Sequence, residues 1–224
     1  MQIELVTWKI TGITPLIQSH PRGLLECAPE PEEGEVSKYK PKKRSGTASN
    51  KEDFAACEKQ LYINDAGLAY HPANAFLSCM REACYKRSLG GKDAQQVMVH
   101  TVTLLETEFI LYDPDTLDAK KPKAFRGKEW QIRLDKGVNH NKNASRGGVG
   151  IRCCRPVYKR WGGLLTLEVD MDFFVGLEGL TEILHIGGHI FGVGVGRMRQ
   201  KGSQGVRPIY GGMGMGKFSA ELRA

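Results

Sequence analysis

The feature that most constrains this chain is a glycine-rich, basic stretch near its C-terminal end, residues 186–218. It holds eleven of the 27 glycines and five Lys or Arg residues, and it contains no Asp or Glu. Glycine loses more backbone freedom on folding than other residues, so such a segment usually needs positive φ angles or a very close approach of its backbone to another group. The cations between the glycines predict that this group is anionic, and a chain of phosphates meets both demands.

Apolar residues flank the glycines regularly, which favours an ordered loop over a flexible basic tail. Residues 190–195 precede the loop and residues 217–222 follow it with alternation, so we expect a strand, the loop and a second strand. The runs 192–196 and 212–216 resemble a dinucleotide-binding fingerprint only superficially. That fingerprint follows a first strand and opens a helix, and neither condition is met, so we reject a dinucleotide site.

The net charge of +7 favours a polyanionic partner. The chain opens directly on a strand pattern, and no apolar run is long enough to span a bilayer, so we expect a cytoplasmic protein without membrane contact. The six cysteines form no CxxC pair, and we expect reduced, mostly buried thiols, no metal site and no cofactor.

The first half of the chain predicts two strands, a hairpin and a helix. Residues 3–13 alternate as a first strand, and residues 59–70 form a hairpin around an Asn-Asp-Ala-Gly turn. Pro72 is expected in the first turn of a helix over 74–86. Residues 97–112 are rich in β-branched and aromatic residues and predict a long strand. The apolar face of the helix comprises Phe76, Leu77, Met80, Ala83 and Cys84.

Two irregular regions are candidates for inserted, mobile arms, at about residues 17–52 and 113–150. The first carries a block of acids followed by a block of bases, which is typical either of a solvated loop or of an arm that orders on nucleic acid. From residue 120 to 160 there are thirteen Lys or Arg and two acids, with Trp130, Tyr158 and Trp161 within or beside the run. Single-stranded nucleic-acid sites use such mixtures, with phosphates on the charges and bases stacked on the rings. The alternative is a solvated basic loop whose aromatic residues face the core.

The last third predicts a strand over 164–174, a short helix over 177–185 that ends at Gly187 and Gly188, and a last core strand over 190–195. Reduced to its core, the order is strand, helix, strand, strand, helix, strand. We therefore expect an α+β protein with a ferredoxin-like, split βαβ palm, long insertions and a C-terminal glycine-rich loop.

With these features the sequence resembles the RAMP superfamily of CRISPR effector proteins. The resemblance rests on the glycine-rich loop, GVGVGR (192–197) through GMGMGKF (212–218), and on ITGITPL (10–16), where the first strand leads into a large insertion. Within the superfamily the chain looks most like the backbone subunit, and similar small proteins also occur in phage and mobile elements. The resemblance implies that the chain binds single-stranded guide RNA and polymerises with copies of itself beside other effector subunits.

Two other functions stay open. One is a metal-independent endoribonuclease that processes CRISPR RNA, and the other is a phage-encoded single-stranded nucleic-acid-binding protein. For catalysis, some relatives use a histidine near the N-terminus, which only His20 matches, and others use an acidic loop residue, where Glu26 or Asp53 could stand. Asp170 and Asp172 share one strand face, which is more often a solvated surface than a metal site. We favour a non-catalytic protein.

Thirteen cations are the candidate nucleic-acid ligands, because they lie in the first arm, in the basic run over residues 120–160 or in the glycine-rich stretch. They are Lys42, Lys43, Arg44, Arg126, Lys128, Arg146, Arg152, Arg155, Arg197, Arg199, Lys201, Arg207 and Lys217.

Overall fold

The computed structural model describes residues 2–19, 51–89, 91–139, 149–172, 177–195, 197–200, 206–208 and 214–223. The chain divides into two compact units. The first unit comprises Met1–Gln18, Tyr62–Gln131 and Val157–Ala224, and the second comprises Ser19–Leu61 and Ile132–Pro156.

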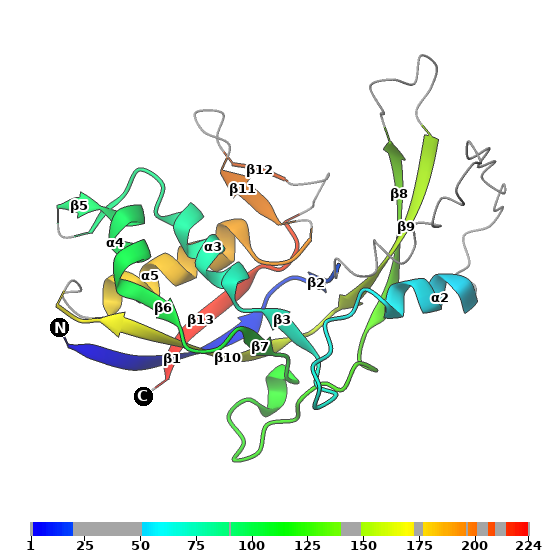
Figure 1. Ribbon diagram of the computed structural model, residues 1–224, viewed down its shortest axis with the longest axis horizontal. Helices are drawn as coiled ribbons and strands as arrows, with labels where there is room; N and C mark the ends of the chain where they lie inside the picture. The colour runs from blue at the N-terminus through cyan, green and yellow to red at the C-terminus, as the bar shows by residue number, and fades with distance from the viewer. Residues whose placement is uncertain are drawn as a thin grey trace, which may run out of the picture. The chain divides into compact units, whose positions relative to one another are not determined.

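The first unit is built on a four-stranded antiparallel sheet. Its strands are β1 (Ile3–Gly12), β6 (Val102–Leu104), β10 (Gly162–Asp170) and β13 (Phe218–Arg223), in the order β13-β1-β10-β6. β1 pairs with β10 along nine positions, from Ile3 opposite Asp170 to Thr11 opposite Gly162. The first and last strands of the chain are therefore neighbours, and β1 lies between β13 and β10 (Figure 1).

Helices cover one face of this sheet (Figure 1). α3 (Asn74–Ala83) and α4 (Ala94–Thr101) lie in the chain between β1 and β6, and α5 (Glu178–Ile186) lies between β10 and β13. Val6, Trp8 and Ile10 of β1 are buried on the helical side. The Trp8 indole N–H donates to the Thr181 hydroxyl of α5 at 3.1 Å, which fixes that helix against the central strand. The fold is thus a mixed α and β arrangement with antiparallel sheets.

An aromatic cluster forms the centre of the first unit. Phe76 of α3 lies 4.5 Å from Phe109 and 5.2 Å from Phe218 between ring centroids. Trp161 lies 6.5 Å from Phe109 and 6.3 Å from Phe218, in edge contacts. All four are almost fully buried. Aromatic pairs at these separations are favourable beyond their buried area, so the cluster ties the last strand to α3.

Short elements complete the chain. In the first unit they are β2 (Leu16–Ile17), β3 (Tyr70–Pro72) with β7 (Glu108–Ile110), β4 (Ser88–Leu89) with β5 (Lys92–Asp93), η1 (Pro114–Thr116), the π-helix η2 (Gly187–Phe191), and β11 (Met198–Gln200) with β12 (Val206–Pro208). The second unit contains α2 (Lys51–Glu58) and most of β8 (Gln131–Asn139) and β9 (Val149–Tyr158), which are neighbouring strands. β2 pairs with the end of β9 that belongs to the first unit, Val157 and Tyr158. None of the helices in the described ranges is long and apolar enough to cross a membrane.

Several sequence predictions are confirmed. β1, β10, α3 and α5 lie where strands over 3–13 and 164–174 and helices over 74–86 and 177–185 were expected. The turn at Asn64 forms as predicted, with the Asn64 side chain accepting from the Leu68 amide and Gly67 at a φ of 72°. Cys57, Cys79 and Cys84 are buried free thiols. Pro72 is not in the first helical turn, because it pairs with Glu108 in β3.

The predicted long strand over residues 97–112 is wrong. The segment contains α4, β6 and β7 instead. Asp93 caps α4, because its carboxylate accepts from the Gln95 and Gln96 amides at 2.9 and 3.1 Å. Such a cap satisfies amides that are otherwise unpaired at a helix start. The cap lies before the β-branched run, and the run alone favoured a strand.

The predicted helix end at Gly187 and Gly188, and the core strand over 190–195, are also wrong. α5 continues into η2, and the chain leaves the helix only at Gly192, whose φ is 73°. A Cβ on Gly188 would lie 2.3 Å from the Phe218 carbonyl oxygen. Glycine is therefore needed at this position for close packing on β13, which is the actual last strand of the sheet.

Candidate nucleic-acid interface

Two glycine runs meet in the first unit, and we call residues 192–195 together with 214–217 the glycine crossing. The Val193 amide donates to the Gly216 carbonyl oxygen at 3.0 Å. Gly192 and Gly216 have φ angles of 73° and 68°, and a Cβ on Gly216 would lie 1.8 Å from the Val193 oxygen. The expected positive φ angles and close approach are confirmed. The group approached, however, is the backbone of the second glycine run.

The chain that follows β1 holds the glycine crossing in place. Six hydrogen bonds connect them. Four join backbone groups: the Ile13 and Thr14 amides donate to the Lys217 carbonyl at 2.7 and 3.2 Å, Gly216 N–H donates to the Pro15 carbonyl at 2.9 Å, and Val195 N–H donates to the Ile17 carbonyl at 3.0 Å. The other two use the Thr14 hydroxyl, which accepts from Lys217 N–H at 2.8 Å and donates to the Gly214 carbonyl at 3.1 Å. Because Thr14 both accepts and donates, one side chain fixes both ends of a glycine segment. The crossing is therefore an ordered part of the unit, joined to the ITGITPL segment.

Arg197 follows the crossing in the chain, and part of its guanidinium group is buried. Its Nη1 atom is buried and has no hydrogen-bond partner in the described part of the chain. No carboxylate in those ranges forms an ion pair with it. A buried guanidinium nitrogen without a partner is unfavourable, since it has lost water and gained no compensating anion. This arrangement can accept an anion such as a phosphate.

Two buried titratable groups lie within electrostatic reach of Arg197. Burial, and after it the Arg197 charge, lower the pKa of His71 to about 4. Burial raises the pKa of the Cys79 thiol to about 12, while Arg197 acts in the opposite sense. His71 Nδ1 is buried without a hydrogen-bond partner among the described residues. At neutral pH both groups are uncharged, so neither compensates the guanidinium.

Lys217 is the second cation of the crossing. Its Cε atom lies 3.0 Å from where a Cβ on Gly214 would stand, so the side chain runs over the glycine. Its charge contributes to lowering the pKa of His189, after burial and the neighbouring His185. Lys217 is half-buried and forms no ion pair with a described carboxylate. The crossing and the residue close after it thus carry two cations, Lys217 and Arg197, that have no counterion among the described residues.

The other cations predicted to bind nucleic acid are not gathered at the glycine crossing. Arg126 and Lys128 are exposed beside Glu129, whose carboxylate accepts from both of their backbone amides at 3.0 Å. Arg199 and Arg207 occupy directly opposed register positions of the β11–β12 ribbon, and their side chains lie outside the described residues. Arg155 is half-buried on β9. Lys42, Lys43, Arg44, Arg146 and Lys201, and the side chain of Arg152, lie outside the described residues.

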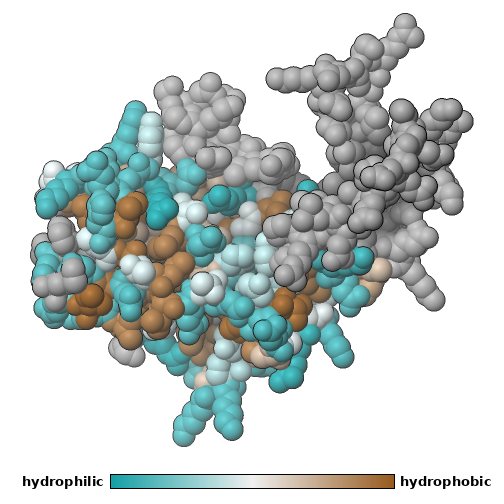
Figure 2. All heavy atoms as spheres, viewed as in Figure 1, coloured by the Kyte–Doolittle hydropathy of each residue, from teal (hydrophilic) through white to brown (hydrophobic). Residues whose placement is uncertain are grey.

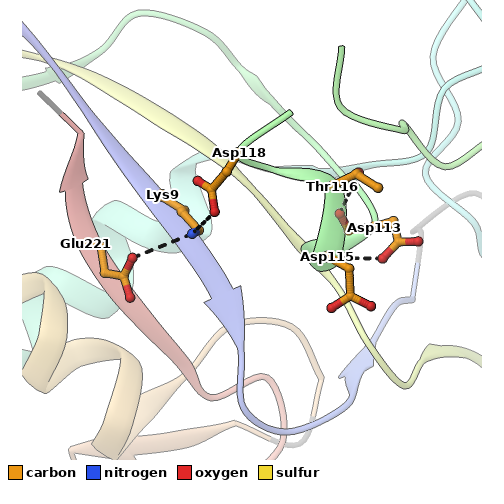
Figure 3. Close-up of polar contacts among 6 residues, drawn as sticks. All are labelled: Lys9, Asp113, Asp115, Thr116, Asp118 and Glu221. Carbon is orange, nitrogen blue, oxygen red and sulfur yellow. Dashed lines mark hydrogen bonds and ion pairs between the residues drawn. The ribbon is translucent and has the colours of Figure 1, made fainter. Parts of the chain in front are cut away.

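The open face of the four-stranded sheet lacks the features of an RNA-binding face. Lys9 is its central cation, and it pairs with Asp118 at 2.6 Å and Glu221 at 3.7 Å (Figure 3). The hydrogen bond to Asp118 is the main reason that the pKa of Lys9 is raised. Glu168 and Asp170 lie on the same face, and its described strand positions include no aromatic residue. Phosphates and stacked bases are therefore better accommodated elsewhere.

Apolar exposure does not distinguish the two sides of the sheet. On the open face, Leu5 is 61% exposed and Ile3 is 57% exposed. On the helical side, Val99 of α4 is 51% exposed, and Figure 2 shows further hydrophobic atoms at the surface where Figure 1 draws the helices. We therefore base the candidate interface on charge and geometry.

The aromatic residues of the basic run are not available for stacking on bases. Trp161 and Tyr158 are fully buried, and Trp130 is only 8% exposed. Tyr158 stacks on Phe125 with ring centroids 5.7 Å apart, and the Trp161 indole N–H donates to the Thr14 carbonyl. The interpretation of these rings as a stacking platform is wrong. They serve the core, which was the stated alternative.

The catalytic candidates gain no support in the described ranges. His20 and Glu26, and the side chain of Asp53, lie outside them. The Asp172 amide donates to the Asp170 carboxylate at 3.1 Å, which is a local turn contact. Searched over the described residues, the chain has no group of three or more His, Cys, Asp and Glu side chains that could hold a metal ion.

Sequence reasoning missed His71, Cys79, His185 and His189. Nothing in the sequence around His71 or Cys79 indicates that Arg197 lies near them. The spacing of four residues between His185 and His189 was a usable signal, because residues four apart on a helix are neighbours. The sequence matches no protein-family model and none of the curated proteins with which it was compared.

Proposed function

We propose that this chain binds single-stranded RNA through phosphates held at the glycine crossing, and that several copies assemble along one strand. The observation that carries the proposal is the buried, unpartnered Nη1 of Arg197 beside an ordered crossing. A phosphate supplies the missing counterion and accepts hydrogen bonds from a guanidinium in a favourable geometry. The net charge of +7 supports a polyanionic ligand over a single small anion.

We also propose that the first unit is a ferredoxin-like palm of the RAMP type. The order of elements, β1, α3 and α4, β6, β10, α5 and β13, supports this proposal, since it is that of a split βαβ fold with one added helix. The sheet order β13-β1-β10-β6 is compatible with it. On this proposal the bound strand is the guide RNA of a cytoplasmic ribonucleoprotein. The acidic, non-aromatic sheet face indicates that the strand follows the crossing instead of the sheet.

The direct test compares three proteins in fluorescence anisotropy with a labelled single-stranded RNA. Arg197→Met removes the unpaired charge and keeps an unbranched stem, and we expect it to weaken RNA binding roughly tenfold, as for one charge-assisted phosphate contact. Arg223→Met is the matched control, because Arg223 is an exposed cation of the open sheet face. Equal losses in both variants, or no loss in Arg197→Met, would contradict the proposed place of binding.

Folding failure is distinguishable from loss of a ligand contact. Removing a buried charge that lacks a counterion does not destabilise a protein as removing one partner of a buried pair does. Arg197→Met is therefore expected to be at least as stable as the wild type while binding RNA more weakly. Assembly is tested separately, because the number of bound chains should rise in proportion to RNA length in sedimentation.

A further inference from the structure

A pair of histidines lies at the junction of α5 and η2. The ring centroids of His185 and His189 are 4.2 Å apart, and the ring planes are inclined by 36°. Both side chains are exposed. His185 lies in the last turn of α5 and His189 lies inside the π-helix. The two imidazoles therefore reach solvent from adjacent turns while already in contact with each other.

The backbone between the two histidines holds this arrangement. The π-helix has a wider turn than an α-helix, which changes the offset between residues four apart, and such turns are frequent at functional sites. Gly187 and Gly188 lie between the histidines, and a Cβ on either would approach Cys79 or Phe218 closely, at 3.1 and 2.3 Å. The wide turn is thus packed on the core of the first unit, and this packing fixes the backbone that connects the two histidines.

The surroundings of His189 favour the uncharged form of its imidazole. The pKa of His189 is lowered by partial burial first, then by His185 and by Lys217. On α5, Glu182 precedes His185 by one turn, and its carboxylate lies 3.7 Å from Arg87. A neutral imidazole offers a nitrogen lone pair, which is the form that binds metal ions.

We propose that His185 and His189 together bind a divalent first-row transition ion, with one ring nitrogen from each. Imidazole nitrogens suit Zn²⁺, Ni²⁺ and Cu²⁺. Because the described residues offer no third His, Cys, Asp or Glu to this pair, water fills the remaining positions. The site is therefore open and exchangeable, unlike a closed structural zinc site with four protein ligands.

Lys217 is expected to affect the metal site and the proposed RNA site in opposite directions. Its positive charge opposes a bound cation near His189, whereas it supports a bound phosphate. Lys217→Gln is therefore expected to tighten metal binding severalfold and to weaken RNA binding. The metal site does not depend on the proposed function, and it is measured without nucleic acid.

The test is a titration of the chelator-treated, nucleic-acid-free full chain with ZnCl₂, NiCl₂ or CuCl₂ in competition with a fluorescent chelator. The measured quantity is the difference in affinity between the wild type and each variant, so that any weak binding elsewhere in the chain cancels. We expect one saturable equivalent in the wild type, and at least about tenfold weaker binding of that equivalent in His185→Ala and His189→Ala. His100→Ala is the control, because His100 is an exposed histidine of α4 that should not matter.

Two results would overturn the proposal. One is an affinity of His189→Ala or His185→Ala equal to that of the wild type, with the circular dichroism of all proteins unchanged. The other is an equal loss in His100→Ala, which would indicate non-specific binding to exposed histidines.

Discussion

Acidification should destabilise the first unit through His71. The imidazole is 5% exposed, and burial together with Arg197 lowers its pKa to about 4 from the ordinary 6.5. Below pH 6.5 the unfolded chain therefore binds a proton that the folded chain does not bind, so stability is complete above pH 6.5 and falls as the pH drops towards 4. At 1.36 kcal/mol for each pKa unit, the loss between pH 7 and pH 4.5 is about 2 kcal/mol.

Tryptophan fluorescence during urea unfolding measures this loss of unfolding free energy in the first unit, which contains His71. Trp8, Trp130 and Trp161 are all buried in the first unit. The free energy of unfolding of the wild type should fall by about 2 kcal/mol more than that of His71→Gln between pH 7 and pH 4.5. His100→Gln should keep the wild-type dependence. Parallel losses in the wild type and in His71→Gln would refute the reasoning.

Three further predictions concern packing and hydrogen bonds. Gly216→Ala places a Cβ 1.8 Å from the Val193 oxygen and should cost several kcal/mol in urea unfolding, whereas Gly67→Ala, also at positive φ but with open space around it, should cost about 1 kcal/mol. Equal costs would show that the close approach is unimportant. Thr14→Val removes both hydroxyl bonds at the crossing and should cost about 1–3 kcal/mol, with faster hydrogen exchange of the Lys217 amide. Tyr158→Phe removes a buried hydroxyl without a described partner and should leave the unfolding free energy unchanged or raise it by up to about 1 kcal/mol; a large loss would reveal a missing bond.

Alternation and helical periodicity predicted the elements that carry the sheet. In β10, Leu165, Leu167 and Val169 are buried in turn, as the sequence pattern required. The same pattern failed at residues 97–112, where a single capping residue, Asp93, decided for a helix. The composition of residues 97–112 favours a strand, whereas the residue that starts the helix, Asp93, lies outside that segment.

The glycine crossing was predictable in kind but not in detail. The number of glycines required positive φ angles and close approach, and both occur at Gly192 and Gly216. The partner of that approach was not predictable, because it comes from a segment more than twenty residues away in the chain. For the same reason the burial of the Arg197 Nη1 atom could not be inferred, since its neighbours are set by how α3, β3 and the crossing pack.

The aromatic residues of the basic run show a further limit. Interleaved Lys, Arg and aromatic residues are typical of single-stranded nucleic-acid sites, yet Trp161 and Tyr158 are fully buried. Charge along the sequence tells nothing about which way a neighbouring ring points. The packing of Trp161 against Phe109 and Phe218, and of Tyr158 against Phe125, determines that.

The salt dependence of RNA affinity tests the central claim most directly. For a single strand, the slope of log affinity against log salt falls by about 0.7 for each phosphate contact that is lost. If Arg197 and Lys217 each hold a phosphate, the double variant Arg197→Met with Lys217→Gln should have a slope about 1.4 smaller than the wild type, with the Arg223→Met slope unchanged. A double variant with the wild-type slope, or a wild type whose affinity does not change with salt, would contradict binding at the glycine crossing.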